Sequence, residues 1–374
     1  MNDSRSRAVR WAATGAVVLV AGFAAFYAYR YFSALPVTRF NAAYDTTRAK
    51  LNTGYFNYDD VVGSFRSMIG NAPNNLLGAR AKLQLAAVLF ARNGTGDRAE
   101  AVRMLKEMVR DESLPPFYRA LAAASMADFF ALTADFEPMK AIAFADEPYA
   151  GFLRDAKGDA ALAARRIFEY ANEIQPTALA KLEIAMIDAS RLMNNLPVPG
   201  MSREEAAQQI QRYVRESSEE ISSLTDDLSR GRIFIYSPVQ RSLFYMLSAI
   251  SLGVSERILH NVGYKDIENL FQKAIALGDQ YQNQRMVVLQ ADIARLYYAA
   301  SLWSRFGDAR FDNAKELLQP VYGRTLDAEV DNVHIEFLRN AGRQPGTFLH
   351  GRLAEVAQKV PALKTFLNKY GWQL

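Results

Sequence analysis

A long uncharged segment near the N-terminus limits what this chain can fold into more than any other feature. Trp11 to Tyr29 form 19 consecutive residues without a charged side chain. At a rise of about 1.5 Å per residue, a helix of this length spans roughly 28 Å, which matches the hydrocarbon thickness of a bilayer. Basic residues precede the segment, Arg30 follows it, and aromatic residues stand at both ends. These are features of membrane anchors, so we expect a transmembrane helix over residues 11–32.

The side chains expected to hold this helix in lipid and at its interfaces are Trp11, Leu19, Phe23, Tyr27 and Arg30. A cleaved signal peptide is the main alternative, with a buried core helix as a third interpretation. Signal peptides usually have an apolar region of about 7 to 15 residues that ends at a small-x-small motif. Here the run is longer, and Phe26 and Phe32 stand where that motif needs a small residue. A retained, single-pass anchor is therefore favoured.

The orientation of the anchor follows less directly from the charges. Residues 1–10 form a short basic tail, which is typical of a signal anchor whose N-terminus stays in the cytoplasm. The rest of the chain would then lie in the periplasm or an equivalent compartment. Basic residues are nearly as numerous just after the anchor, so a cytoplasmic body remains the alternative.

The remainder of the chain predicts an all-α fold. Apolar residues recur at spacings of three and four residues, which indicates one-sided helices. Turn and cap residues separate these stretches at Asn71–Pro73, Asn93–Asp97, Leu114–Pro116, Pro197–Gly200 and Phe306–Asp308. The one β-rich run, residues 232–236, is expected to be an extended connector, with Ser237 and Pro238 as the N-cap and first residue of the next helix.

Several helices are expected to pack in pairs. Residues 75–92, 98–110 and 117–132 form an alanine-rich series, and 265–277, 288–306 and 312–321 repeat its pattern. Small residues stand where paired helices would touch: Ala81, Ala101, Ala291 and Ala314. This pattern resembles tetratricopeptide repeats, which implies a right-handed α-solenoid with a concave binding surface. The resemblance covers residues 75–132 and 265–322, the latter within a C-terminal region, 261–374, of helical pairs and a cap, whereas 133–260 is expected to form irregular helical hairpins.

The order of segments carries a second resemblance. A basic tail, one anchor helix, juxtamembrane helices over 33–74 and an alanine-rich repeat body are together similar to the bitopic ancillary subunit of the bacterial Sec translocon. This likeness implies a chaperone-like role beside a translocation machinery. A cap helix that begins at Pro361 is expected to close the body.

Two segments are candidates for contact with partners. In the acidic helix expected over 202–230, a heptad-like seam includes Ile210, Val214, Ile221 and Leu224, which could support self-association. The alternative is a helix packed within the body. The aromatic insert around Phe136, Phe144 and Tyr149 could hold a peptide or pack its own rings.

Composition argues against catalysis and nucleic-acid binding. The chain has no cysteine and three histidines, and its net charge of +4 is spread over 374 residues. It contains no phosphate-binding glycine motif, and His334 and Glu336 would face different sides of a helix. We therefore expect no cofactor, no metal, no nucleic acid and no enzymatic activity.

These features together predict a membrane-anchored helical-repeat scaffold or adaptor that binds partner proteins in a cell-envelope complex. A translocation subunit, a divergent membrane-bound enzyme and a ligand-binding receptor with an apolar interhelical cavity are the alternatives.

Overall fold

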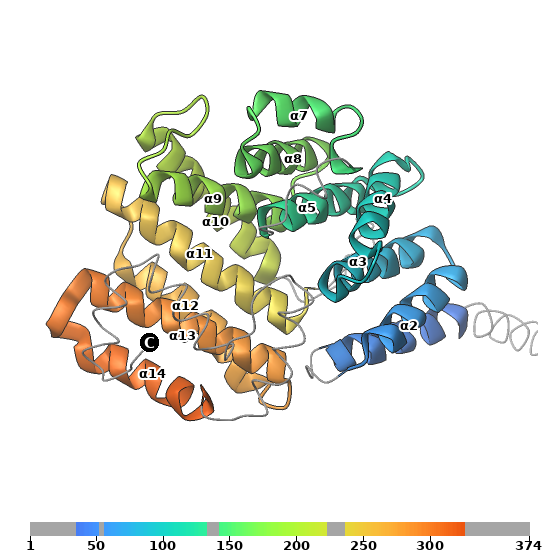
Figure 1. Cartoon of the computed structure of the whole chain (residues 1–374). Coiled ribbons are helices and arrows are strands. Elements are labelled where there is room, and N and C mark those ends of the chain that lie inside the picture. Colours follow the sequence, from blue (N-terminus) through green and yellow to red (C-terminus); the bar gives the residue numbers. More distant parts are fainter. Residues whose placement is uncertain (1–34, 52–55, 133–141, 223–235, 326–374) are drawn as a thin grey trace, which may run out of the picture.

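The computed structural model describes residues 35–51, 56–132, 142–222 and 236–325 of the chain. This part is all-α, with no strand among the described residues (Figure 1). A helix over residues 35–51 comes first. It is followed by α2 (Tyr58–Gly70), α3 (Asn75–Arg92), α4 (Asp97–Arg110), α5 (Pro116–Leu132), α7 (Tyr149–Asp155), α8 (Ala160–Ile174), α9 (Ala178–Met193), α10 (Arg203–Ser222), α11 (Pro238–Leu259), α12 (Tyr264–Gln280), α13 (Arg285–Phe306), a 3-10 turn (Gly307–Arg310) and α14 (Phe311–Thr325). The expected anchor and C-terminal cap lie outside the described residues.

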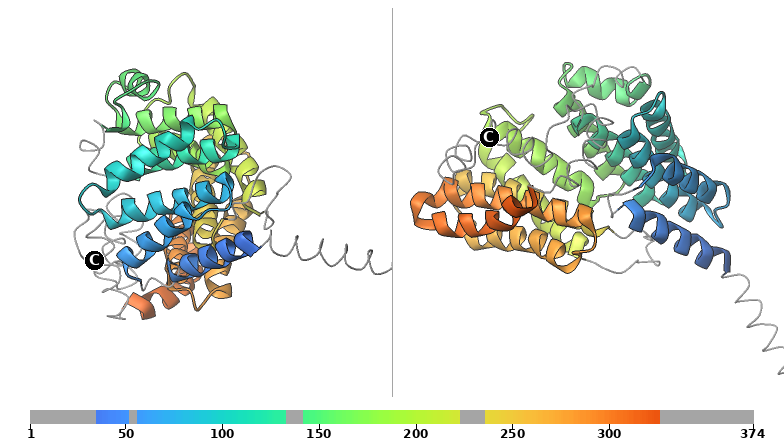
Figure 2. Two further views of the ribbon diagram at one scale, coloured as in Figure 1. Left: turned by 90° about the vertical axis from the view of Figure 1, so that its right-hand side faces the viewer. Right: turned by 60° about the horizontal axis from the view of Figure 1, so that its bottom comes forward.

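The helices form two layers. In the inner layer, α3 contacts α5, α5 contacts α9, α9 contacts α11, and α11 contacts α13. The outer layer consists of α2, α4, α8, α10, α12 and α14, each of which packs against its inner-layer neighbours in sequence. Helices therefore alternate between the layers along most of the chain, as in a helical-repeat protein. Figure 2 shows α2–α5 and α11–α14 on opposite sides, with α9 and α10 between them.

The chemistry of the two layers differs for a simple reason. Outer helices such as α8 and α12 have one apolar face and one charged face, because only one side meets protein. Inner helices such as α3 and α13 have apolar residues nearly all round, since they pack against the outer layer and against one another. The layers come close at small residues: Ala81, Ala101, Ala291 and Ala314 are fully buried, as expected from their positions in the pairs.

Two hydrophobic cores share one helix. The first core is built from the helices between residue 35 and α9, and the second from α9 to α14. Ile184 and Ile187 of α9 belong to the first core, whereas Leu182 and Ala185 belong to the second. Because α9 supplies side chains to both cores, it connects the two halves of the body.

Local sequence signals explain where the helices begin. Ser237 caps α11: the backbone N–H of Gln240 donates to the Ser237 hydroxyl, and the Gln240 side chain accepts from the Ser237 backbone N–H. Pro238 occupies the first helical turn, as predicted. Asn57, Asn74 and Thr177 accept backbone hydrogen bonds at the starts of α2, α3 and α9. The predicted turn motifs Asn71–Pro73 and Pro197–Gly200 lie between helices, and the other three overlap a helix end.

One helix of the described part is long and apolar enough to cross a membrane. It is α11, whose most apolar window has a mean hydropathy of 1.2 and is 61% buried inside the body. A membrane span and the core helix of a globular body share this composition. The position of α11 in the inner layer accounts for it equally well.

Candidate functional site

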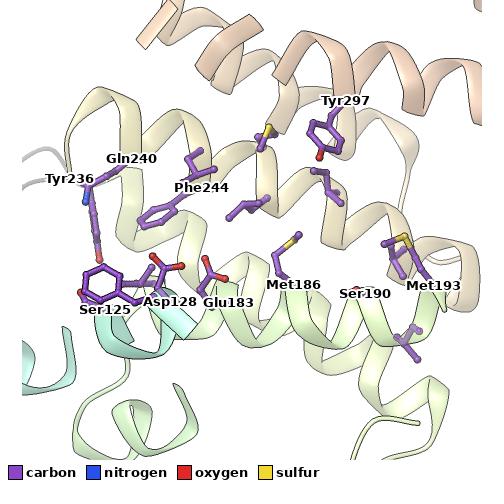
Figure 3. Close-up of a pocket in the computed structure, with 18 of the residues that line it drawn as sticks. Ser125, Asp128, Glu183, Met186, Ser190, Met193, Tyr236, Gln240, Phe244 and Tyr297 are labelled. Carbon is purple, nitrogen blue, oxygen red and sulfur yellow. The ribbon is translucent and has the colours of Figure 1, made fainter. Parts of the chain in front are cut away.

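A cavity of about 1240 Å³ lies along the inner layer, where the two halves of the chain face each other (Figure 3). Its walls come mainly from α3, α5, α9, α11 and α13, and Arg203 at the start of α10 lines one end. On each long wall helix the lining residues recur every three or four positions, as in Leu179, Glu183, Met186, Ser190 and Met193 of α9. The inner helices therefore use one face to pack and another to line the cavity.

The walls of the cavity are mainly apolar. Met186 of α9 lines the cavity together with Leu247 and Ile250 of α11, and Phe244 stands about one turn before Leu247 on α11. The Ser251 hydroxyl donates to the sulfur of Met186 at 3.0 Å, which ties α9 to α11 along the cavity floor. Ala87 of α3 is exposed on the wall. A surface of this kind suits an apolar ligand.

Two acidic residues interrupt this apolar lining at one end. Asp128 comes from α5 and Glu183 from α9, and their carboxyl groups lie side by side below Phe244 (Figure 3). Both side chains are partly exposed, and they line the cavity. Neither carboxyl group has an ion pair or hydrogen bond with a described residue. The pair is therefore an uncompensated acidic site in an apolar wall.

The environment of the pair favours the neutral, protonated form of both carboxyl groups. Burial raises the pKa of Asp128 to about 7. Burial, and then the neighbouring charge of Asp128, raise the pKa of Glu183 well above its usual value. In such a desolvated pair, ionisation of both carboxyl groups at once is unfavourable unless a cation binds beside them.

The opposite end of the cavity is basic and open. Arg203 and Arg257 line this end and are exposed. Arg203 donates to the Asn195 side chain at 2.9 Å, and Arg257 donates to the Ser304 hydroxyl at 2.8 Å. Met193 is 53% exposed here. Ten residues of α9 separate Glu183 from Met193, which corresponds to about 15 Å of helix.

The predicted partner-binding seam is used inside the chain. Ile210, Val214 and Ile221 of α10 are buried, and α10 packs between α9 and α11. Leu224 and the remainder of the expected helix to residue 230 lie outside the described residues. In this arrangement the seam serves the second core and takes no part in the cavity.

The aromatic insert also lies away from the cavity. Phe144 packs on Phe130, and Tyr149 packs edge-on against Tyr170; both Phe144 and Tyr149 are buried. Lys106 of α4 donates to the carbonyl groups of residues 142 and 143 and to Asp146, which joins this segment to the first core. Phe136 lies outside the described residues, as do Trp11, Leu19, Phe23, Tyr27 and Arg30 of the expected anchor.

Sequence reasoning did not identify Asp128 or Glu183. They lie 55 positions apart, so their pairing depends on the contact of α5 with α9. One local signal was present: Asp128 is the sole acidic residue of the mainly apolar helix α5. An acid on such a helix must face a partner, water or a cavity.

Comparisons with protein-family models, curated protein sequences and solved structures gave no match for this chain.

Proposed function

We propose that this protein is a membrane-tethered helical-repeat binding protein whose inner cavity holds an apolar segment of a partner polypeptide. The observation that supports this most strongly is the continuous lining of one cavity by α3, α5, α9, α11 and α13. A site shared by many helices of a repeat body is the usual way in which α-solenoids bind extended partners.

The size and shape of the cavity favour a polypeptide over a small metabolite. Pockets for small ligands usually enclose about 300–1000 Å³. This cavity, at about 1240 Å³, exceeds that range and has an open end near Met193. A helix of about ten residues, or a shorter extended segment, would match its length along α9.

The tether is the predicted transmembrane helix over residues 11–32. Together with the repeat-like body, it supports a scaffold or adaptor in a cell-envelope complex. The resemblances to tetratricopeptide repeats and to the Sec ancillary subunit suggest chaperone-like handling of exported chains as one form of this activity. No catalytic step is part of the proposal.

Photo-crosslinking in membranes tests the proposal. A benzophenone amino acid at Leu247, in the cavity wall, should form adducts with a partner polypeptide, whereas the same label at Gln208, on the exposed face of α10, should not.

A cavity-filling variant supplies the control. Ala87→Trp places a large ring in the cavity from an exposed position, so it should abolish the Leu247 adducts without unfolding the chain. Ala161→Trp adds the same ring to the exposed face of α8 and should leave them unchanged. Adducts that persist in Ala87→Trp, or a Leu247 label that captures no polypeptide, would contradict the proposal.

A further inference from the structure

We propose that Asp128 and Glu183 together recognise a basic side chain, a lysine or an arginine, carried by the otherwise apolar polypeptide segment that enters the cavity. This inference rests on the proposed function, and it specifies which segments the cavity accepts. The two carboxyl groups lie side by side at one end of the cavity, Asp128 on α5 of the first half and Glu183 on the shared helix α9.

The partners of the most deeply buried acids in this chain support the proposal. Four acidic side chains are almost fully buried in the described part of the chain, and each forms an ion pair with an arginine: Asp97 with Arg92, Asp188 with Arg165, Glu256 with Arg305 and Asp292 with Arg295. The fold thus compensates its buried carboxylates from within. Asp128 and Glu183 have no such partner among the described residues. Because they lie in the cavity wall, a bound ligand can supply the positive charge that pairs with them.

The residues around the pair favour a cation at the end of an aliphatic side chain, as in lysine or arginine. A lysine ammonium or arginine guanidinium between two carboxylates would make charge-assisted hydrogen bonds to both. Phe244 and Met186 lie beside the pair, where they would contact the aliphatic stem of such a side chain. An acidic segment would be repelled, and a purely apolar one would leave both carboxyl groups desolvated and unpaired.

A peptide selection tests the inference with a defined probe. The full chain in lipid nanodiscs is presented with a displayed library of randomised ten-residue peptides, and peptides that also bind the Ala87→Trp variant are discarded. We expect the remaining peptides to be apolar with one enriched lysine or arginine. The selection is repeated on the double variant Asp128→Asn/Glu183→Gln, which keeps the shape of the wall and removes its charges. Here the enrichment for a basic residue should disappear.

A second double variant controls for net charge. Glu107→Gln/Glu219→Gln removes two exposed carboxylates, one from α4 and one from α10, neither of which lines the cavity, and should select the same basic peptides as the parent chain. Circular dichroism melting of all variants establishes that each is folded.

Affinity measurements then isolate the charge. A selected peptide is synthesised with its lysine or with norleucine, which has an apolar side chain of similar length. By fluorescence anisotropy the lysine peptide should bind the parent chain at least about tenfold more tightly, and the two should bind Asp128→Asn/Glu183→Gln about equally.

The outcomes separate the two proposals. Cavity-dependent peptides without a basic residue, or an unchanged basic enrichment on Asp128→Asn/Glu183→Gln, would overturn the inference and leave the proposed function standing. No cavity-dependent peptide at all would overturn both. Tighter binding of dodecylammonium than of the selected lysine peptide would show that the cation comes from a small amphiphile, against the polypeptide proposed here.

Discussion

Arg165 and Asp188 join α8 to α9 through an ion pair that solvent hardly reaches. The Arg165 Nε donates to Asp188 Oδ1 at 2.7 Å, and Nη2 donates to Oδ2 at 3.1 Å. The side chains are 3% and 0% exposed, respectively. Burial raises the pKa of Asp188 although Arg165 opposes the shift, so the pair carries a desolvation cost. On the same helix, Glu183 lines the cavity and has no ion pair with a described residue, in contrast to Asp188.

Breaking this pair from one side should destabilise the body strongly. Asp188→Asn leaves the Arg165 guanidinium buried with Glu169 as its remaining acidic partner. We expect a loss of about 3–5 kcal/mol in the free energy of unfolding, measured by urea denaturation. The double variant Arg165→Met/Asp188→Leu removes both charges and should retain a stability close to that of the parent chain. A single variant as stable as the parent would show that the pair is not a structural contact.

The acid pair in the cavity should make the empty protein less stable as the pH rises. The folded-state pKa of Asp128 is raised to about 7, whereas an unfolded aspartate titrates near 4. The folded state therefore binds more protons between these values, and its stability falls as pH increases from about 4 to 7. The other charged residues of the cavity wall, Arg203 and Arg257, lie at its far end.

Urea denaturation at pH 5 and pH 7.5 measures this dependence. Asp128→Asn/Glu183→Gln should lose less stability between the two pH values than the parent chain does. An identical pH dependence in both proteins would rule out the raised pKa values as its source.

The contact of α12 with α13 requires a glycine at position 278. A Cβ atom built there would lie 2.4 Å from the Cβ of Ala291, and both residues sit inside helices. Gly278→Ala should therefore lower the free energy of unfolding by about 1–3 kcal/mol through overpacking. At Gly253 of α11 the nearest atom, Ile267 Cδ1, would be 3.9 Å from the new Cβ. Gly253→Ala should be neutral or stabilising by up to about 1 kcal/mol, because alanine favours helix. Thermal unfolding of the two variants tests this contrast.

Membrane extraction tests the predicted anchor. The full chain should remain in the pellet after alkaline carbonate treatment of membranes, because a spanning helix resists removal. A variant that lacks residues 1–32 should pass into the supernatant. If the truncated chain stays in the pellet, another segment must hold it, and α11 would be the first helix to examine.

Local features of this fold could be predicted from the sequence, and contacts between distant segments could not. The start of α11 was predicted from Ser237 and Pro238, and the capping box that Ser237 forms with Gln240 lies within one turn. The heptad-like spacing of Ile210, Val214 and Ile221 correctly indicated an apolar face on α10. Such a stripe does not encode what covers it, and in the folded chain α9 and α11 cover it.

The candidate site shows the same difference between local features and contacts of distant segments. The apolar character of α5, α9 and α11 was visible in the sequence, and the possibility of an interhelical cavity followed from it. The meeting of Asp128 with Glu183 was not visible, because it depends on how α5 crosses α9 after the intervening segment and α8. Their chemistry arises from a shared apolar environment that neither residue has in its own sequence neighbourhood.

The shared helix α9 ties the two halves of the body into one cooperative unit. Unfolding of either half would remove packing contacts from α9, and the other half also packs on α9. The cavity has walls from both halves, so it exists only while both are folded. A ligand that binds in the cavity would therefore stabilise both halves of the folded body, and its dissociation would lower the stability of both.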